Sequence, residues 1–279
     1  MASPQPKERP EALAPHATLS EYYRSDRDRP GFVRGLFDRA AADYDTIERG
    51  MGLGSGRRYR REALARAGLA KGMRVLDVAI GTGLVAREAI RLVGDARLVT
   101  GLDPSAGMVA QARRNLAVGG VLGMGEQLPW RDASFDFVSM GYALRHLADL
   151  TVTFREFARV LRPGGTLCIH ELTKPRSRAG HALIRLYLHG VVPLLTRLRT
   201  RNPEATLLMR YFWDTIENCV PPERILAALD EAGFLASERT LVIGLFSEYT
   251  ARKPDPDGGP VPPPGAAGED SFFVRRIAR

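Results

Sequence analysis

The stretch that most constrains the fold is an aliphatic run that ends in an acid and a glycine-rich turn. It extends from Arg74 to Leu84 and reads Arg-Val-Leu-Asp-Val-Ala-Ile-Gly-Thr-Gly-Leu. Val75, Leu76 and Val78 predict a buried strand, and the small residues after them predict a sharp turn into a helix. Glycines let a ligand approach the backbone closely, and amides at the start of a helix favour a carboxylate or a phosphate. The turn therefore predicts a nucleoside-like cofactor, with a purely structural turn as the alternative.

A second acid, Asp103, supports this interpretation. Residues 98–103 read as another buried strand that ends in this acid. An acid about twenty residues beyond the glycine turn is placed to accept hydrogen bonds from both hydroxyls of a ribose. Capping of the next helix is the alternative role of the same carboxylate.

Strand and helix patterns alternate through the middle of the chain. Further strands are expected at 121–124, 135–140, 166–172 and as a pair within 238–250, and helices at 30–44, 57–67, 85–93, 104–116, 150–161 and 222–232. The alternation predicts an α/β fold with a Rossmann-like, mostly parallel seven-stranded sheet and helices on both faces. The ligand of such a sheet binds at the carboxyl ends of the strands.

A helical insertion of about 178–218 interrupts the alternation after the fifth strand. It holds two apolar helical stretches, 181–198 and 203–219, which we expect to cover the ligand edge as a lid. The first stretch has more apolar residues than one buried helix face needs, and basic residues flank it: Arg185, Arg197, Arg199 and Arg201. Such a helix can line a tunnel for a prenyl chain, lie on an anionic membrane surface, form a homodimer interface through the lid helices, or simply pack in the core.

The two ends of the chain differ from its middle in composition. Residues 1–16 are rich in Pro, Glu and Lys and predict a disordered N-terminus. Residues 17–253 form one catalytic domain, and 254–279 read as a Pro/Gly-rich tail. Residues 271–279 alternate enough to add an edge strand, which we leave out of the predicted sheet.

Charge and cysteine content exclude several classes of protein. The net charge is +8, but the basic residues are interleaved with acids, so no nucleic-acid partner is expected. Cys168 and Cys219 are the only cysteines, which indicates neither a disulfide framework nor a thiolate metal site. A secretory signal and an apolar stretch of about eighteen residues are both lacking. The chain is therefore expected to be cytoplasmic and metal-free, with contact to a membrane surface left open.

Five motifs occur in the order and spacing of one enzyme family. They are residues 75–83, 101–105 with Met108, 125–130, 134–136 and 161–165. Together they resemble the class I S-adenosylmethionine-dependent methyltransferases. The resemblance implies that S-adenosyl-L-methionine is the cofactor and S-adenosyl-L-homocysteine the product. A dinucleotide oxidoreductase, the competing interpretation of the first two motifs, does not account for the last three.

The resemblance also implies where the cofactor binds. Its methionine carboxylate would lie at the glycine turn, its ribose at Asp103 and its adenine near Gly125 and Glu126. The residues implied in cofactor binding are Tyr44, Asp77, Ala79, Gly81, Thr82, Gly83, Asp103, Pro104, Met108, Met124, Gly125, Glu126 and Gly141. Ala79 replaces the first glycine of the turn because less backbone must approach a ligand without a pyrophosphate. For Ile80 the only role we predict is packing beside the cofactor.

A finer resemblance covers about residues 32–253. Segments 37–45, 142–146 and 171–175, with the lid around Tyr211, resemble the ubiquinone/menaquinone biosynthesis C-methyltransferases. Those enzymes methylate a ring carbon of a prenylated hydroquinone, which implies a hydrophobic phenol or quinol as substrate. The chain departs from them at Met124, where a polar residue is usual, and at His146, where they carry Asn.

Three side chains are candidates for catalysis of such a transfer. A ring hydroxyl must lose its proton or be polarised before the neighbouring carbon attacks, and the pKa of a phenol is about 10. Arg145 can stabilise the phenolate, while Glu171 can act as general base and His146 can move a proton. The structural alternatives are an Arg145–Asp149 pair, a Glu171–Lys174 pair or helix cap, and a structural hydrogen bond of His146. Two further functions stay open at this point: an N- or O-methyltransferase of a lipid amine or specialised metabolite, and a non-catalytic cofactor-binding module.

Overall fold

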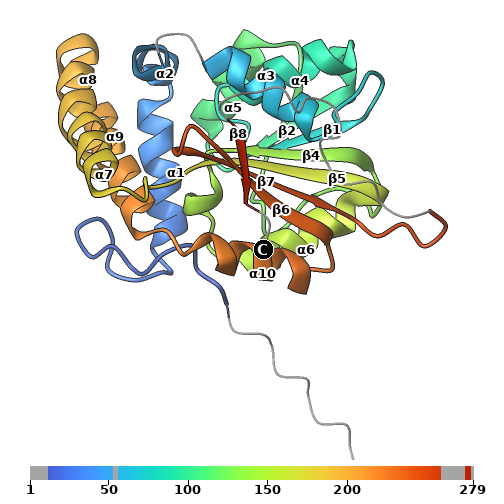
Figure 1. Ribbon diagram of the computed structural model, residues 1–279. Coiled ribbons are helices and arrows are strands. Elements are labelled where there is room, and N and C mark those ends of the chain that lie inside the picture. The colour runs from blue at the N-terminus through green and yellow to red at the C-terminus, as the bar shows by residue number, and fades with distance from the viewer. Residues whose placement is uncertain (1–11, 53–55, 259–273, 278–279) are drawn as a thin grey trace, which may run out of the picture.

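A single twisted sheet forms the centre of the computed structural model, which describes residues 12–52, 56–258 and 274–277. Its strands are β1 (Val75–Val78), β2 (Val99–Asp103), β3 (Gly119–Leu122), β4 (Phe135–Gly141), β5 (Leu161–Leu172), β6 (Leu235–Val242), β7 (Phe246–Arg252) and β8 (Val274–Ile277). They lie in the order β3-β2-β1-β4-β5-β7-β6-β8 (Figure 1). The first five strands are parallel, and β7, β6 and β8 each run antiparallel to their neighbours.

The seven strands expected from the sequence are confirmed, and the structure adds an eighth. β8 pairs with the outer edge of β6, with Val274 opposite Val242 and Ile277 opposite Arg239. This strand lies within residues 271–279, whose alternation allows an edge strand but which the sequence analysis leaves out of the predicted sheet. Strand β3 begins two residues earlier than the predicted 121–124 because the pair Gly119-Gly120 already joins the ladder of β2.

Helices cover both faces of this sheet, as the alternating pattern predicts. The helices of the described residues are α1 (Arg29–Ala40), α2 (Tyr44–Gly52), α3 (Gly56–Arg66), α4 (Leu84–Val93), η1 (Ala96–Leu98), α5 (Ala106–Asn115), η2 (Leu144–His146), α6 (Leu150–Val160), α7 (Arg178–Arg185), η3 (Leu186–Val191), α8 (Val192–Thr200), α9 (Pro203–Asn218) and α10 (Pro222–Glu231). Helices α3, α4 and α5 pack over one face, and α6 and α10 over the other (Figure 1). Each face has its own apolar core.

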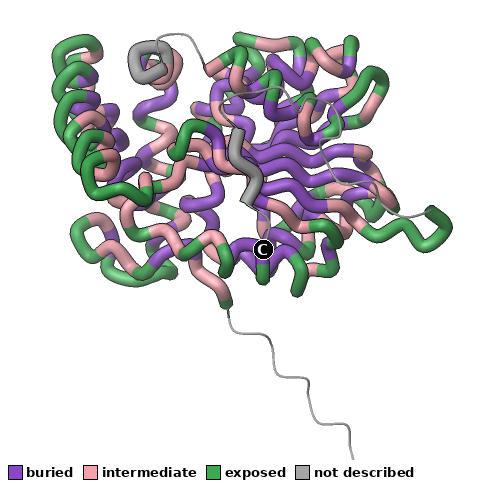
Figure 2. The backbone as a smooth tube through the Cα atoms, in the orientation of Figure 1, coloured by how far each residue is buried: buried purple, intermediate pink, exposed green. Residues whose placement is uncertain are grey.

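The insertion after β5 forms a third apolar cluster away from the sheet. Helix α9 packs its buried residues, such as Leu208 and Phe212, against Val33 and Leu36 of α1. The single helix expected at 181–198 is instead interrupted by the π-helical turn η3. In Figure 2 the outer surface of α7 and α8 is exposed, whereas α9 beneath them is largely buried.

Part of the N-terminal stretch is packed against the domain, contrary to the expected disorder of residues 1–16. Residues 1–11 lie outside the described residues, but 12–16 are bonded to the start of α6 and to the segment that precedes α10. The carbonyl of Leu13 accepts the Leu150 N–H at 2.9 Å, and that of Pro15 accepts the Val220 N–H at 2.8 Å. His16 is buried, and its carbonyl accepts a hydrogen bond from Arg29 at 3.0 Å. Composition alone missed this segment because its attachment is made by backbone carbonyls.

Ile80 packs onto strand β2, which gives this side chain a structural reason. It is buried, and a Cβ added to Gly101 would lie 2.9 Å from the Cβ of Ile80. We therefore expect Gly101→Ala to lower the free energy of unfolding by about 1–3 kcal/mol through overpacking. Ile80→Ala alone is expected to cost about 2–4 kcal/mol through the cavity that it leaves.

The double variant Ile80→Ala/Gly101→Ala tests whether these two residues share one space. The methyl group added at position 101 fills part of the cavity left at position 80. The double variant should therefore lose clearly less unfolding free energy than the two single variants lose together. Urea unfolding followed by circular dichroism measures all three variants. Strictly additive costs would show that the two side chains do not compete for the same volume.

Candidate active site

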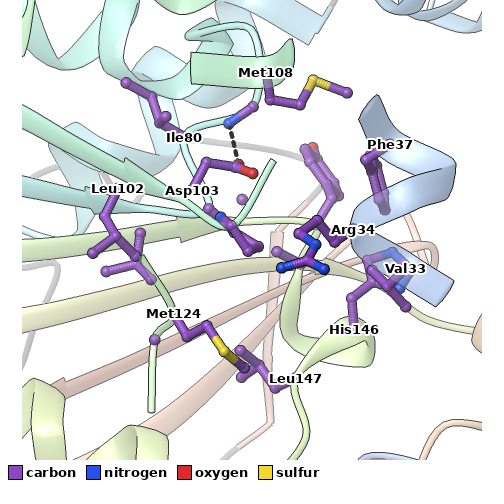
Figure 3. A pocket seen from close by; sticks show the side chains of 18 of the residues that line it. Val33, Arg34, Phe37, Ile80, Leu102, Asp103, Met108, Met124, His146 and Leu147 are labelled. Carbon is purple, nitrogen blue, oxygen red and sulfur yellow. Dashed lines mark hydrogen bonds between the residues drawn. The ribbon is translucent and has the colours of Figure 1, made fainter. Parts of the chain in front are cut away.

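A cavity of about 450 Å³ opens at the carboxyl ends of β1, β2 and β4. Its floor consists of residues that follow these strands, among them Ala79, Asp103 and Tyr142. Helix α1 covers it from the opposite side with Val33, Arg34 and Phe37 (Figure 3). The cavity lies at the sheet edge where the sequence predicts a ligand.

The glycine turn after β1 forms one wall of the cavity. Ala79, Gly81 and Gly83 all have positive φ, at 54°, 56° and 90°. Ala79, Gly81 and Thr82 line the cavity, and the Thr82 hydroxyl is buried without a hydrogen-bond partner among the described residues. Gly83 instead shapes the turn, since a Cβ there would lie 2.6 Å from Leu116 Cδ1. Ala79 thus adopts a left-handed backbone conformation that glycine adopts more easily. The alanine that stands in place of the first glycine therefore carries backbone strain, which the sequence analysis did not predict.

Asp103 lies at the centre of the cavity floor and is held by two backbone amides. Its Oδ2 accepts the Gly81 N–H at 2.9 Å, which is the dashed line in Figure 3. Its Oδ1 accepts the Ser105 N–H, also at 2.9 Å. Burial raises the pKa of this carboxyl to about 6. The cap of α5 is Ser105, whose hydroxyl accepts the Met108 N–H at 3.1 Å, rather than Asp103. Each oxygen of Asp103 keeps a free lone pair, so the carboxylate can accept two hydroxyl donors from a ligand.

The far end of the cavity is a largely apolar slot. Leu102, Met124 and Leu147 face it in Figure 3, and Pro104, Met108, Gly125 and Glu126 also line the cavity. A Cβ at Gly125 would lie 3.3–3.5 Å from three neighbouring side chains. The carboxylate of Glu126 accepts the Ala148 N–H at 2.8 Å. The slot suits a flat ring, which needs apolar contact on its faces.

Tyr44 and Gly141, which the resemblance implies in cofactor binding, also line the cavity. Burial raises the pKa of the Tyr44 hydroxyl to about 12. Gly141 is required by close packing, since a Cβ there would lie 2.5 Å from Val85 Cγ2. The residue after it, Tyr142, has a positive φ of 60° and also lines the cavity.

Two arginines in the cavity wall were missed from the sequence. Arg60 of α3 is buried, lies 5.5 Å from the Tyr142 ring centroid and donates to Glu48 Oε1 at 2.6 Å. Its Nε has no partner among the described residues. Arg34 of α1 faces the cavity from the other side (Figure 3). No local signal marks either residue, because each stands in a helix with several other arginines.

Asp77 is placed differently from the sequence-based expectation. It is buried at the end of β1 and does not belong to the cavity lining. Its Oδ1 accepts the hydroxyl of Ser139 at 2.7 Å, and burial raises the pKa of the carboxyl to about 7. Asp77 was expected to contact a cofactor directly, but the structure places its side chain outside the cavity lining, where it bonds to Ser139 of β4.

Arg145 and Glu171 form a buried ion pair behind the cavity wall. Arg145 Nη1 donates to Glu171 Oε1, its Nε donates to Thr215 Oγ1 at 3.2 Å, and its guanidinium lies 4.5 Å from the Phe212 ring centroid. Burial lowers the pKa of Arg145 to about 10. Neither side chain lines the cavity, although both were expected to touch the substrate. Asp149, the partner considered for Arg145, instead caps α6.

His146, the third catalytic candidate, does line the cavity. Its ring stacks on Tyr211 at 5.5 Å between centroids and meets the edge of Phe37 at 5.3 Å. Both ring nitrogens are buried without a partner among the described residues. Burial, with the charge of Arg145, holds the pKa of His146 well below its ordinary value. The imidazole is therefore neutral near pH 7 and keeps a lone pair for a donor.

The cavity is covered by α1 rather than by the insertion. Among the described residues, its lining contains nothing from 178–218. Helix α9 packs against the outer side of α1, and its Tyr211 backs the ring of His146. The expected lid thus supports the cover without facing the ligand itself.

Comparison with known proteins agrees with this geometry. Residues 23–253 match the ubiE/COQ5 methyltransferase family. A demethylmenaquinone methyltransferase of Beutenbergia cavernae is 35% identical over 230 residues, covering 82% of this chain and 93% of the relative. A ubiquinone/menaquinone biosynthesis C-methyltransferase UbiE of Hahella chejuensis is 31% identical over 234 residues, covering 81% and 93%.

Solved structures share the fold at lower identity. An S-adenosyl-L-methionine-dependent methyltransferase of Methanococcus maripaludis superposes with a TM-score of 0.56 at 20% identity, covering 79% of this chain and 95% of that one. One from Thermotoga maritima gives 0.54 at 19% identity, covering 78% and 99%. The match to the family extends over most of the chain and includes every strand from β1 to β7. The chain therefore belongs to the ubiE/COQ5 methyltransferase family of S-adenosyl-L-methionine-dependent enzymes.

Proposed function

We propose that this enzyme transfers a methyl group from S-adenosyl-L-methionine to a ring carbon of a hydrophobic, prenylated phenol or quinol. The observation that carries the proposal is that one cavity is lined both by Asp103, a carboxylate suited to a ribose, and by His146, a neutral histidine. The names of the relatives support the class of acceptor, because they describe methylation of demethylmenaquinone.

The residues of the cavity fit the cofactor part by part. Asp103 would accept the two ribose hydroxyls, and the slot of Leu102, Met124 and Leu147 would take the adenine. The unpartnered groups of Thr82 and Arg60 would bind the amino-acid end, where Arg60 supplies the positive charge that a carboxylate needs. When bound, S-adenosyl-L-methionine supplies a methyl group already activated on its sulfonium, and S-adenosyl-L-homocysteine is the product.

Arg60→Met tests the assignment of the carboxylate. Loss of a charge-assisted hydrogen bond of about 1.5–3 kcal/mol should raise the Kd for S-adenosyl-L-methionine about tenfold to hundredfold. Isothermal titration calorimetry measures the change. Arg61→Met, at an exposed neighbour in the same helix, is the matched control and should leave the Kd unchanged. Equal effects of the two variants would remove Arg60 from the site.

His146 is our candidate to take the hydroxyl proton of the acceptor. The reacting carbon gains electron density only when a neighbouring hydroxyl is deprotonated or strongly hydrogen-bonded. The neutral imidazole lies between Phe37 and Tyr211, and the protein itself occupies neither of its nitrogens. Arg145 and Glu171 then act as positioning residues for η2, which carries His146.

His146→Phe removes the nitrogens while keeping a ring of similar width. We expect kcat to fall about tenfold to hundredfold, less than for the strongest general bases because water can take over part of the role. The KM for S-adenosyl-L-methionine should be unchanged, and steady-state kinetics separate the two parameters. His189→Phe, at an exposed histidine of η3, is the control. A parallel rise in KM would point instead to a role in holding the cofactor.

Product analysis tests the proposed reaction itself. The enzyme is incubated with methyl-labelled S-adenosyl-L-methionine and a reduced demethylmenaquinone analogue, and the site of the label is determined by mass spectrometry and NMR. A new carbon–carbon bond on the ring is expected, with loss of the ring proton at that carbon. A label on oxygen or nitrogen only would favour the alternative N- or O-methyltransferase. Tight cofactor binding without turnover of any acceptor would favour a non-catalytic module.

A further inference from the structure

The outer surface of the insertion exposes a row of large apolar side chains. Leu183 and Leu186 are 66% and 65% exposed, and Leu194, Leu195 and Leu198 are 57%, 47% and 67% exposed. These five residues lie on α7, η3 and α8, which form the outer edge of the molecule (Figures 1 and 2). We call them the leucine face.

The fold itself does not need this face. The same helices bury Leu188, Val192 and Thr196 on their inner side, where they pack toward α9. Helices of soluble proteins usually combine one apolar side with a polar one. A helix pair that is apolar inside and outside therefore has an outer side available for something else to cover.

The charged side chains of the segment that carries the leucine face all have one sign. Residues 173–203 contain seven basic side chains and no Asp or Glu. The seven are Lys174, Arg176, Arg178, Arg185, Arg197, Arg199 and Arg201, and all are exposed. None of the six arginines forms a salt bridge with another described residue, and only Lys174 reaches an acid, Glu217. The face is thus an apolar strip among six arginines that no described acid pairs with.

We propose that the leucine face and its arginines dock this enzyme on an anionic phospholipid surface. Leucines can enter the boundary between headgroups and acyl chains while the arginines contact lipid phosphates. Within the described residues, no helix is both long enough and apolar enough to cross a bilayer, so the helices lie along the surface. The binding uses residues outside the cavity and goes beyond the proposed reaction.

Charge favours this occupant over a second copy of the chain. A two-fold symmetric contact places the same patch of each protomer against its own copy. Arginines such as Arg197 and Arg199 would then meet arginines, and like charges repel at close range. An anionic lipid surface complements the same arginines. The homodimer through the lid helices is therefore an outcome of the test and no longer our proposal.

Flotation with vesicles tests the docking. The full chain is mixed with vesicles of phosphatidylcholine alone or of phosphatidylcholine with phosphatidylglycerol. We expect binding to the anionic vesicles that weakens with added salt, and little binding to the neutral ones. Binding equal on both, or absent from both, overturns the proposal.

Two sets of variants assign the effect to this face. Arg197→Glu/Arg199→Glu should reduce partitioning by more than about twentyfold, since each basic residue near the surface contributes about fivefold. Leu183→Ser/Leu186→Ser/Leu198→Ser should abolish binding while all seven basic charges remain. The matched controls are Arg61→Glu/Arg114→Glu and Leu235→Ser/Ile243→Ser, at exposed positions elsewhere. Controls that lose binding as strongly as the test variants would contradict the assignment.

Two further measurements separate docking from folding, catalysis and self-association. The leucine variant should keep the urea midpoint of the wild type and its turnover of a short-chain, water-soluble acceptor. Sedimentation velocity without lipid should give the same mass for both proteins. A wild-type dimer that the leucine variant converts to a monomer would identify a second copy as the occupant and overturn the proposal. A failed methylation assay with intact vesicle binding would count only against the proposed reaction.

Discussion

Asp103→Asn is expected to weaken S-adenosyl-L-methionine binding about a hundredfold or more. The carboxylate accepts two backbone amides and has lone pairs left for two ligand hydroxyls. An amide in its place would turn one acceptor into a donor that faces donors, and each lost charge-assisted bond is worth about 1.5–3 kcal/mol. Titration calorimetry measures the loss. Glu231→Gln, at an exposed acid of α10, is the control.

The same residue should make cofactor affinity depend on pH. The pKa of Asp103 is raised to about 6 by burial, and only its ionised form accepts both hydroxyls. Affinity should therefore fall as the pH drops below about 6 and be level above pH 7, whereas Asp103→Asn should remove this dependence. The free energy of unfolding of the cofactor-free protein depends on pH with the opposite sign. Because the raised pKa means that the folded chain binds more protons, the contribution of Asp103 to stability decreases as pH rises from about 4 to 6.

Arg145→Met should lower the free energy of unfolding by about 3–5 kcal/mol, since it leaves Glu171 buried without a counter-ion. Arg145 is 0% and Glu171 2% exposed, so solvent does not screen the remaining charge. The double variant Arg145→Met/Glu171→Leu removes both charges and should recover to within about 2 kcal/mol of the wild type. Urea unfolding measures each step.

Activity of that double variant distinguishes a positioning role from a catalytic one. Because neither side chain lines the cavity, we expect kcat to stay within about tenfold of the wild type. A well-folded double variant whose kcat has fallen a thousandfold would return Arg145 to the reaction itself. The phenolate-stabilising role drawn from the sequence would then be correct despite the geometry.

Features encoded within a few neighbouring residues could be predicted from the sequence. The glycine turn and Asp103 follow directly from strands that end where the local pattern says they end. Their meeting across β1 and β2 follows from the parallel pairing of consecutive strands. The part of the cavity that the glycine turn and Asp103 form was therefore largely predictable.

The acceptor end depends on contacts between distant segments, which local patterns do not encode. Arg145 meets Glu171 only because β4 and β5 end side by side. The same holds for one residue that we assign to the cofactor, since Arg60 reaches the cavity only through the packing of α3. The cover formed by α1 could not be inferred, since its apolar spacing fits equally well against a sheet or against α9. For the same reason β8 was left out of the predicted sheet, because it pairs with residues of β6 that lie 32 to 38 positions earlier in the chain, from Val242 opposite Val274 to Arg239 opposite Ile277.

Residues 12–16 tie together elements that are remote in the chain, and this has a consequence for local opening. The amides of Leu150 and Val220 are protected only while the carbonyls of Leu13 and Pro15 accept them. Arg29, at the start of α1, is bonded to the same short segment. Detachment of this segment would therefore free both amides for hydrogen–deuterium exchange and release the first turn of the helix that covers the cavity. We therefore expect exchange at Leu150 and Val220 to report on access to the cavity beneath α1.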